Sequence, residues 1–488
     1  MAPRFQPTDA GAAGRRRLAA GALALAVVAP TMPRSCDTAV VIELPRTAVP
    51  ECPEGRRIAG VCAGVPPGPV CSDEACTADV ACSQTVKVDD DPTLQAALTV
   101  AKAGTCIALG PGVYGDAAVP GGVSLLGVGA ESVEVASVVV GAGEKSVLRG
   151  FAVAGGILLQ GAMHTRIVSV RVTGSAGDGV EVGSDSSVAV ETSEIGGAAR
   201  YGIGAFDSGD VQATESVIEG AEGGGLWMSC TAECDCAAVP TLLLDKVILQ
   251  ENHRVGVSVV GVAARLTDVR IDRTTTDKSF DGGFGLAASG CADLEALGLR
   301  VVDSSANGVL IDKANARLGA EGAGRGVNVD RNIGGIWIQH ISTAKMQSVR
   351  LESVGLSDNS AVGIGIAGQS SGVVIRGAVI HGTETITLPS GQGTPGGSVE
   401  VGDGLVWLDH SFADIDGLRV GASARASVLI DGQVATGSKL SHVTLVDGDE
   451  EKGIVQQSCP AGGTAPEVGP ETPPIKTTSG TTFELPWN

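Results

Sequence analysis

The sequence of 488 residues predicts an all-β fold, a right-handed parallel β-helix, in which short strands stack coil upon coil. Glycine directly precedes an apolar-x-apolar triplet again and again between residues 179 and 404, and three of the eight intervals are 23 residues long. A second alternating segment follows in the repeats, as in IVSVRVTG and RLTDVRID. A unit of this size cannot bury its apolar face alone, so the repeats must stack. The right hand is expected because parallel crossovers favour it.

The composition agrees with a narrow, repetitive core. Aromatic residues make up only 3% of the chain and glycine 71 residues, while apolar residues still reach 43%. Valine, isoleucine, leucine and alanine must therefore fill the interior. The net charge of −21 makes nucleic acid and acidic membrane surfaces poor partners, because like charges repel.

The first 35 residues have the features of an export signal. The basic cluster Arg15 to Arg17 precedes the apolar run Leu18 to Ala29, which is too short to span a bilayer. We therefore expect a secreted, periplasmic or cell-surface protein without a transmembrane span in the mature chain. Cys36 is a candidate for lipid modification, although residues 32–35 lack the small and leucine residues of a lipobox.

Residues 36–83 form a cysteine-rich segment, in which we expect disulfides to replace a core. The chain has twelve cysteines, an even number, so all can pair in an oxidising compartment, whereas a lipid on Cys36 would leave one thiol over. A zinc site is the alternative for this segment, but no histidine stands among its cysteines.

The β-helix itself is expected over residues 84–459, after a short capping helix. Asp91 is the expected N-cap, Pro92 the first helical position, and Leu94 and Leu98 lie on one apolar face. Such a helix covers apolar core and unpaired backbone groups at the open end of the stack. Residues 460–488, rich in Pro, Gly and Thr, are expected to form a flexible tail.

The start of this region resembles a known group of proteins. The order TLQAAL, AGTCIALGPGVYGD and VPGGVSLLGVG, followed by coils, resembles the secreted bacterial right-handed β-helix proteins of the pectin-lyase-like superfold. The resemblance covers residues 84–459 and implies the fold, with polysaccharide as the expected ligand. It matches no enzyme subfamily, because the motifs of pectin methylesterases, polygalacturonases and mannuronan epimerases are absent.

One segment, GLVWLDHSFADIDGLRV at residues 404–420, resembles the vWiDH segment of pectate lyases. Asp409 and His410 match its Asp-His pair, and Asp416 with Gly417 matches the Asp-Gly that follows. The resemblance implies a calcium ion that neutralises a uronate carboxylate and a base, for which Arg419 is the candidate. The spacing is shorter than in the family, and no Pro-Arg segment follows.

The repeat offers a structural explanation of the same segment. Asp416 takes a second-strand position like that of Asp245 and Asp268 in other coils, and Trp407 is a third triplet member that packs inward. Asp409 and His410 are the residues that the repeat leaves unexplained.

The middle residue of each triplet should point outward, which makes Trp227 and Trp337 candidate binding residues. Four coils separate them, so the two indoles should lie roughly 19 Å apart on one face. Exposed indoles are stacking platforms for sugar rings or for a protein partner. The alternative is that neighbouring insertions cover them.

Four cysteines, Cys230, Cys234, Cys236 and Cys291, form two disulfides or, alternatively, a four-thiolate zinc site. The coils that carry Cys230 and Cys291 are two steps apart, about 10 Å, which is too far for a direct bond between rungs. The loop must therefore fold back if Cys291 pairs with it.

These observations predict an exported β-helix that binds polysaccharide or serves as a structural protein, with no cofactor. A calcium-dependent polysaccharide lyase, or another enzyme acting on uronans, is the alternative function.

Overall fold

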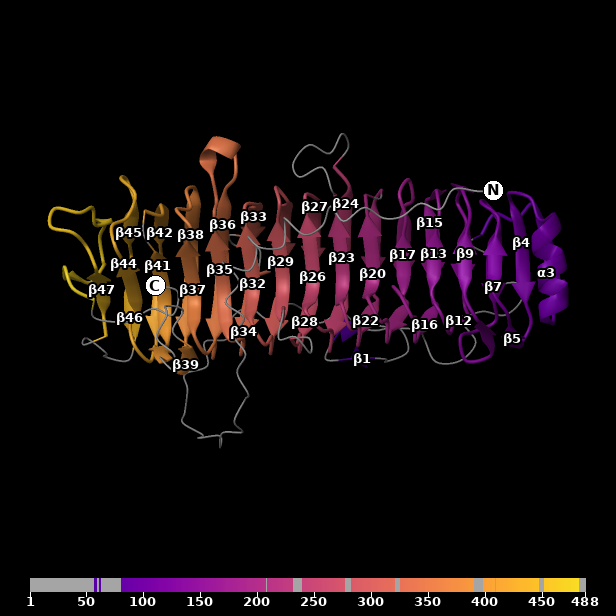
Figure 1. Cartoon of the computed structure of the whole chain (residues 1–488), viewed down its shortest axis with the longest axis horizontal. Helices are drawn as coiled ribbons and strands as arrows, with labels where there is room; N and C mark the ends of the chain where they lie inside the picture. The colour runs from indigo at the N-terminus through magenta and orange to yellow at the C-terminus, as the bar shows by residue number, and fades with distance from the viewer. Residues whose placement is uncertain are drawn as a thin grey trace, which may run out of the picture.

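The computed structural model describes residues 57–58, 61–62, 80–207, 209–230, 239–276, 282–320, 325–389, 398–408, 410–446 and 452–481. These residues form one long rod of stacked coils, with the single α-helix at the N-terminal end (Figure 1). The predicted parallel β-helix is confirmed by the strand pairings. The predicted signal peptide, residues 1–35, and nearly all of the cysteine-rich segment lie outside the described residues.

Most coils contribute one strand to a 15-stranded parallel sheet that contains the triplets, which we call the triplet sheet. Its strands in chain order are β6 (Ala117–Val119), β9 (Val138–Val140), β13 (Ile157–Leu159), β17 (Val180–Val182), β20 (Tyr201–Phe206), β23 (Gly224–Ser229), β26 (Val255–Val260), β29 (Phe284–Ser289), β32 (Asn307–Asp312), β35 (Gly334–Gln339), β37 (Val362–Ala367), β41 (Asp403–Leu408), β44 (Val428–Asp431), β47 (Ile454–Gln457) and β49 (Ile475–Thr477).

The remaining coil strands pair into a 28-stranded sheet, which we call the bent sheet because the chain turns a corner within most coils. Its strands are β3 (Gln84–Val88), β4 (Thr105–Leu109), β5 (Gly112–Tyr114), β7 (Ser124–Gly127), β8 (Val133–Val135), β11 (Val147–Arg149), β12 (Ala152–Val153), β15 (Thr165–Val168), β16 (Arg171–Thr173), β18 (Val188–Glu191), β19 (Glu194–Gly196), β21 (Val211–Thr214), β22 (Val217–Glu219), β24 (Thr241–Asp245), β25 (Ile248–Gln250), β27 (Ala263–Thr267), β28 (Arg270–Asp272), β30 (Asp293–Leu297), β31 (Arg300–Val302), β33 (Asn315–Leu318), β34 (Val327–Asp330), β36 (Val349–Ser357), β38 (Val373–His381), β42 (Ala413–Asp416), β43 (Arg419–Gly421), β45 (Lys439–Ser441), β46 (Thr444–Val446) and β48 (Glu467–Val468).

The core lies inside the coils and follows the period of two that the triplets predict. The first and third members of all nine triplets are at most 1% exposed. Between Leu226 and Met228, for example, Trp227 points the other way and stays half-buried. Pairing keeps equivalent residues together, since Ile203 lies opposite Leu226 and Gly204 opposite Trp227.

The glycine before each triplet is required by the close approach of the next coil. A β-carbon added to Gly225 would lie 2.6 Å from the carbonyl oxygen of Gly256, and one added to Gly363 would lie 2.5 Å from that of Gly404. Any residue with a β-carbon would clash at such distances, which explains why these glycines recur.

Corners within the bent sheet use left-handed residues, each followed by a buried residue. Glu215, Lys246 and Asp268 have φ angles of 49°, 53° and 52° at this corner. Asp268 is therefore a corner residue, one position beyond the place predicted for it, whereas Asp245 ends its strand as expected.

Buried asparagines satisfy the backbone at another corner. The Nδ2 of Asn332 donates to Oδ1 of Asn359 at 3.1 Å, and Nδ2 of Asn359 donates to the Val329 carbonyl at 2.8 Å. Buried polar groups of this kind require partners, and stacking the same residue type on successive coils supplies them.

The N-terminal end is covered by helix α3 (Asp91–Val100), which buries Leu94, Ala97 and Leu98. Its N-cap is Asp90, whose carboxylate accepts the amide of Thr93 at 2.9 Å, so the predicted cap was one residue late. Asp91 instead accepts the amide of Gly115 at 2.8 Å and ties the helix to the first coils. Within the described residues, this helix is too short, and none is long and apolar enough, to cross a membrane.

The C-terminal end of the β-helix lies beyond the predicted boundary at residue 459. Strand β48 pairs with β45, and β49 pairs with β47, so both sheets continue into the region expected to be a flexible tail. Backbone pairing rather than apolar pattern drives this addition, because the side chains of Glu467 and Val468 are exposed. Residues 482–488 lie outside the described part.

A buried ion pair joins the coils near this end. The carboxylate of Asp403, 0% exposed, accepts hydrogen bonds from Nε of Arg425 at 3.0 Å and from the amide of Ala426 at 3.1 Å. The Arg425 side chain is 12% exposed. Burial raises the pKa of Asp403, and the Arg425 guanidinium opposes that shift.

We predict that Asp403→Asn lowers the free energy of unfolding by about 3 kcal/mol, because it leaves the Arg425 charge without its counter-ion. A urea titration measures the loss. The matched control is Glu191→Gln, whose partner Arg166 is 42% exposed, and there the loss should stay below about 1 kcal/mol. Equal losses in the two variants would contradict the assignment of Asp403 as a structural residue.

Candidate functional site

The segment 404–420 is divided by the fold among three elements. Trp407 belongs to β41, Asp416 ends β42 and Arg419 begins β43. His410 lies in the turn before β42 in a left-handed conformation with φ of 55°, and Asp409 lies outside the described residues. The proposed lyase residues therefore belong to different parts of one coil rather than to a single strand.

Within this segment, Asp416 is engaged by the next coil. Its Oδ1 accepts from the Ser441 hydroxyl at 2.9 Å and lies 2.6 Å from Nδ1 of His442. Hydrogen bonds from His442 and Ser441 lower the pKa of Asp416, so it is a carboxylate at neutral pH. The Nε2 of His410 lies 2.8 Å from Nε2 of Gln433, and Arg419 is exposed.

Trp407 is a core residue. Its side chain is 0% exposed, and its indole Nε1 donates to the carbonyl of Ser411 at 2.9 Å. No part of this ring faces a ligand, which agrees with its third position in the triplet.

The sequence offered a calcium site at residues 404–420 and a zinc site at Cys230, Cys234, Cys236 and Cys291. In the described ranges, no three or more His, Cys, Asp or Glu side chains are grouped so that they could hold a metal ion. Cys230 and Cys291 are both disulfide-bonded, whereas Cys234 and Cys236 lie outside the described residues. A cysteine in a disulfide has no thiolate to offer zinc.

The two tryptophans proposed for binding lie on one outward row of the triplet sheet, which we call the indole row. Successive pairings connect its members on β23, β26, β29, β32 and β35: Trp227, Ser258, Ala287, Leu310 and Trp337. Four strand spacings separate the indoles, which corresponds to about 19 Å. Both side chains are partly exposed.

Trp227 belongs to an aromatic cluster that the sequence did not indicate. Its ring centroid lies 5.4 Å from that of Tyr201, and Tyr201 lies 6.0 Å from Phe206. The guanidinium of Arg200 stands 5.8 Å from the Tyr201 ring and 5.4 Å from the Phe206 ring. The only sequence signal was that Tyr201, one of two tyrosines, directly precedes a triplet glycine.

A buried carboxylate, that of Asp178, fixes Arg200 and the backbone of Tyr201 in this cluster. Asp178, 0% exposed, accepts Nη2 of Arg200 at 3.0 Å and the amide of Tyr201 at 3.1 Å. Burial raises the pKa of Asp178, while the Tyr201 amide and Arg200 act in the opposite direction. Burial also raises the pKa of Tyr201, so its phenol keeps a proton to donate at neutral pH.

Trp337 lies flat against the next coil. A β-carbon added to Gly365 would come within 2.1 Å of Cε3 of Trp337, so the indole rests on the Gly365 backbone. Its Nε1 donates to Oε1 of Gln339 at 2.9 Å. The ring is partly exposed and also packs against the apolar cluster that includes Val399 and Val406.

A hairpin covers the indole row just beyond Trp337. An antiparallel hairpin of β39 (Ile386–Pro389) and β40 (Ser398–Val401) packs onto the outward residues of the next coils. Val406 and Leu429, which continue the row, are 0% exposed. Val406, expected on the open face, is therefore covered by an insertion at this end of the row.

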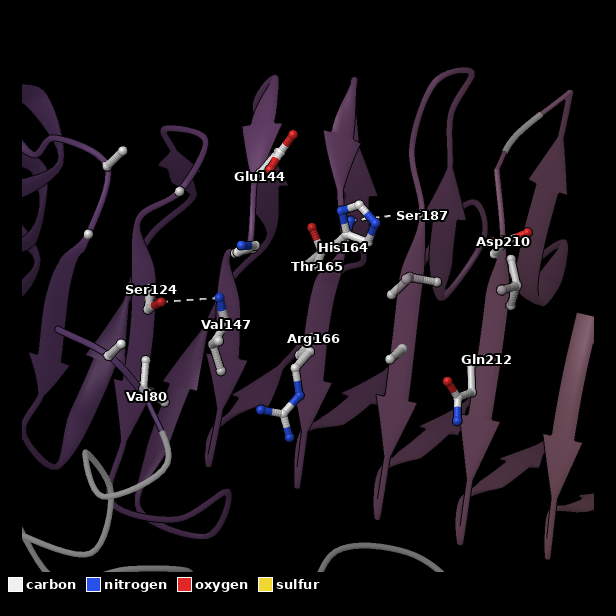
Figure 2. A pocket seen from close by; sticks show the side chains of 18 of the residues that line it. Val80, Ser124, Glu144, Val147, His164, Thr165, Arg166, Ser187, Asp210 and Gln212 are labelled. Atoms are coloured by element: carbon white, nitrogen blue, oxygen red, sulfur yellow. Dashed lines mark hydrogen bonds between the residues drawn. The ribbon is translucent and has the colours of Figure 1, made fainter. Parts of the chain in front are cut away.

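A second concave surface lies on the bent sheet (Figure 2). This groove of about 680 Å³ crosses the outward faces of β11, β15, β18, β21 and β24. Its lining includes Val147, Arg166, Gln212 and Leu243, with Glu144, His164 and Asp210 along one rim. Arg166 is held by Glu191 at 2.9 Å. No sequence motif pointed to this groove.

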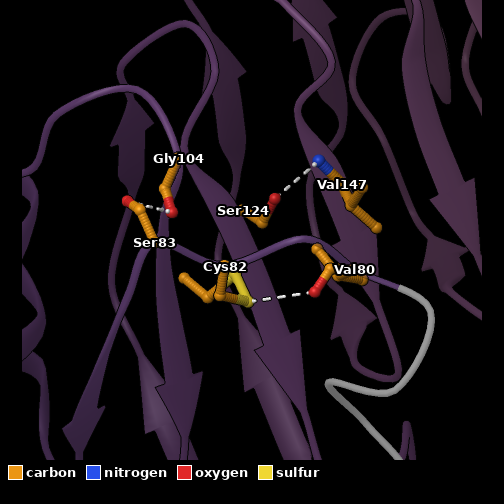
Figure 3. Close-up of a disulfide and its surroundings, with 7 residues drawn as sticks. Val80, Cys82, Ser83, Gly104, Ser124 and Val147 are labelled. Carbon is orange, nitrogen blue, oxygen red and sulfur yellow. Dashed lines mark hydrogen bonds between the residues drawn. A yellow bond between two sulfur atoms is a disulfide. The ribbon is translucent and has the colours of Figure 1, made fainter.

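A disulfide between Cys82 and Cys106 fixes the N-terminal end of the groove (Figure 3). It holds Val80 and Cys82 against the outer side chains Cys106, Leu126 and Val147. Cys459, in contrast, is a free and buried thiol, so the even number of cysteines does not lead to pairing of this residue.

The chain matches no protein-family model and no curated protein sequence. Among solved structures it is similar to the catalytic unit of a thermostable GH87 α-1,3-glucanase from Streptomyces thermodiastaticus, with a TM-score of 0.44, 14% identity, and 79% of this chain and 70% of that chain covered. It is similar to the A-module of a mannuronan C-5 epimerase from Azotobacter vinelandii, with a TM-score of 0.32, 13% identity and coverage of 83% and 99%. A pectate lyase gives a TM-score of 0.30, 11% identity and coverage of 60% and 79%.

We predict that Trp407→Ala lowers the free energy of unfolding by about 3–5 kcal/mol, because it removes a fully buried indole and its hydrogen bond. The matched control is Trp227→Ala, which should cost clearly less because that ring is partly exposed already. Urea titrations of the two variants compare the losses. A loss at residue 407 no greater than at residue 227 would refute the core assignment.

Proposed function

We propose that this protein is an exported β-helix scaffold that binds polysaccharide along the triplet sheet, at the cell surface or in the periplasm. The observation that carries the proposal is the indole row, on which Trp227 and Trp337 stay partly exposed on one face. Flat, rigid aromatic faces with polar edges are suited to stacking against sugar rings.

The surroundings of both rings favour this role. Trp227 stands beside Tyr201, whose protonated phenol supplies a hydrogen-bond donor next to the stacking surface. Between the two indoles the row itself holds only smaller side chains, those of Ser258, Ala287 and Leu310. Export is supported by the basic and apolar start of the chain and by the Cys82–Cys106 disulfide.

We predict that the double variant Trp227→Ala, Trp337→Ala loses at least about tenfold in affinity for the glycan that the wild type retains. Affinity gel electrophoresis over a panel of acidic and neutral polysaccharides measures the change. Val113→Ala is the matched control, because Val113 is an exposed apolar residue, 76% exposed, on β5 of the bent sheet and does not line the groove. Retention that is equal in both variants would remove the indole row from the proposal.

A calcium-dependent lyase is the second candidate, favoured by the resemblance of residues 404–420 to the pectate lyase segment. On this hypothesis His410, Asp416, Arg419 and the neighbouring Asp409 act on a uronan. Incubation with uronans, with and without calcium, should then raise the ultraviolet absorbance of unsaturated products. His410→Ala and Arg419→Ala should abolish that rise. Trp227→Ala should at most reduce it, because that variant affects substrate binding and not the reaction. Absence of any rise would leave the binding role alone.

A further inference from the structure

We propose that the ligand of the indole row is a neutral, linear glycan that lies along the rod axis and contacts both indoles at once. This inference rests on the proposed function and narrows it to one class of ligand. It follows from the path between the rings, from the side chains beside that path and from the charge around it.

The path crosses consecutive strands between two fixed ends, and its first residue after Trp227, Ser258, is 5% exposed. Trp227 with Tyr201 and Phe206 forms the N-terminal end, and the β39–β40 hairpin closes the row just after Trp337. The intervening side chains lie on consecutive strands, each paired with the next. A chain that runs across the strands therefore meets both platforms about 19 Å apart.

A parallel row of outward residues borders the path, and we call it the companion row. It consists of the residues two positions after each member of the indole row: Ser229, Val260, Ser289, Asp312 and Gln339. Hydroxyl and amide groups both donate and accept hydrogen bonds, as sugar hydroxyls do. All five side chains are partly exposed.

The charges on the two rows are unsuited to an acidic polymer. No lysine or arginine occupies either row between the two indoles, and the one charged member is Asp312, whose Oδ1 lies 2.7 Å from Nδ1 of His340. A polyanion on this path would meet the carboxylate of Asp312 and an overall charge of −21.

Cations stand outside the two rows. Arg200 is paired with the buried Asp178 and stacked over Tyr201 and Phe206. Arg254, in the turn before β26, acts on Tyr201 at the N-terminal end of the path, where its charge opposes the burial that raises the pKa of that phenol, and Lys313 follows β32. Between the indoles the two rows themselves hold neutral side chains and one carboxylate, which fits sugar hydroxyls better than carboxylate or sulfate groups.

Contact with both indoles makes affinity depend on chain length. An oligosaccharide that reaches only one ring gains one stacking contact, whereas a longer one gains the second as an intramolecular step. Removing either indole should therefore reduce the affinity of long oligomers to that of short ones.

The test measures binding of neutral glucan oligomers and of uronate oligomers, each from dimer to octamer, by isothermal titration calorimetry. We expect neutral oligomers to gain at least about tenfold in affinity once they span both indoles, and that gain should vanish in Trp227→Ala and in Trp337→Ala. Uronate oligomers of the same length should bind more weakly, and Asp312→Asn should improve their binding. The charge control is Asp293→Asn, which removes an exposed acid on the bent sheet and should leave the affinity for uronate oligomers unchanged.

The outcomes separate this inference from the function on which it rests. Uronate oligomers that bind as tightly as neutral ones, with a loss in Trp227→Ala, would overturn the neutral class and leave polysaccharide binding standing. An affinity that does not depend on chain length would overturn simultaneous contact with both rings. If neither series binds, both the inference and the proposed function fail.

Discussion

The register between successive coils is the constraint on which this structure depends. Every strand of the triplet sheet pairs with the equivalent strand of the next coil, and the backbones approach so closely at the triplet glycines that a β-carbon does not fit. Because side chains alternate with a period of two, a slip by one residue would turn each inward member outward. The same register that fills the core therefore decides which side chains form the outer surface.

The outer surface owes its functional features to this stacking. Trp227 and Trp337 are far apart in the sequence, and the pairings of β23 through β35 bring them onto one row. The β39–β40 hairpin folds back over the outward residues Val406 and Leu429 and covers the row at this end.

Two ion pairs with a buried carboxylate and the same sequence spacing support different parts of the triplet sheet. Asp178 and Asp403 each directly precede a triplet glycine, and each binds an arginine 22 residues later and the backbone amide that follows that arginine. Arg200 stacks on Tyr201 and Phe206. Arg425 instead donates a hydrogen bond to the carbonyl of Glu400 in the hairpin strand β40. The fold thus uses one structural device to position an aromatic cluster and to fix a covering segment.

The sequence by itself determined the β-helix, its triplet glycines and the direction of nearly every triplet side chain, because a period of two is a local property of each strand. Trp407 and Trp227 were assigned to opposite sides in this way, and the structure agrees for both. Only the tertiary structure decided what lies next to these side chains. The cluster of Tyr201, Phe206 and Trp227, the cover over Val406, the partners of Asp416 on the next coil and the addition of β48 and β49 all depend on contacts between coils and insertions. Such contacts join residues far apart in the chain, and a repeat pattern read along one strand carries no information about them.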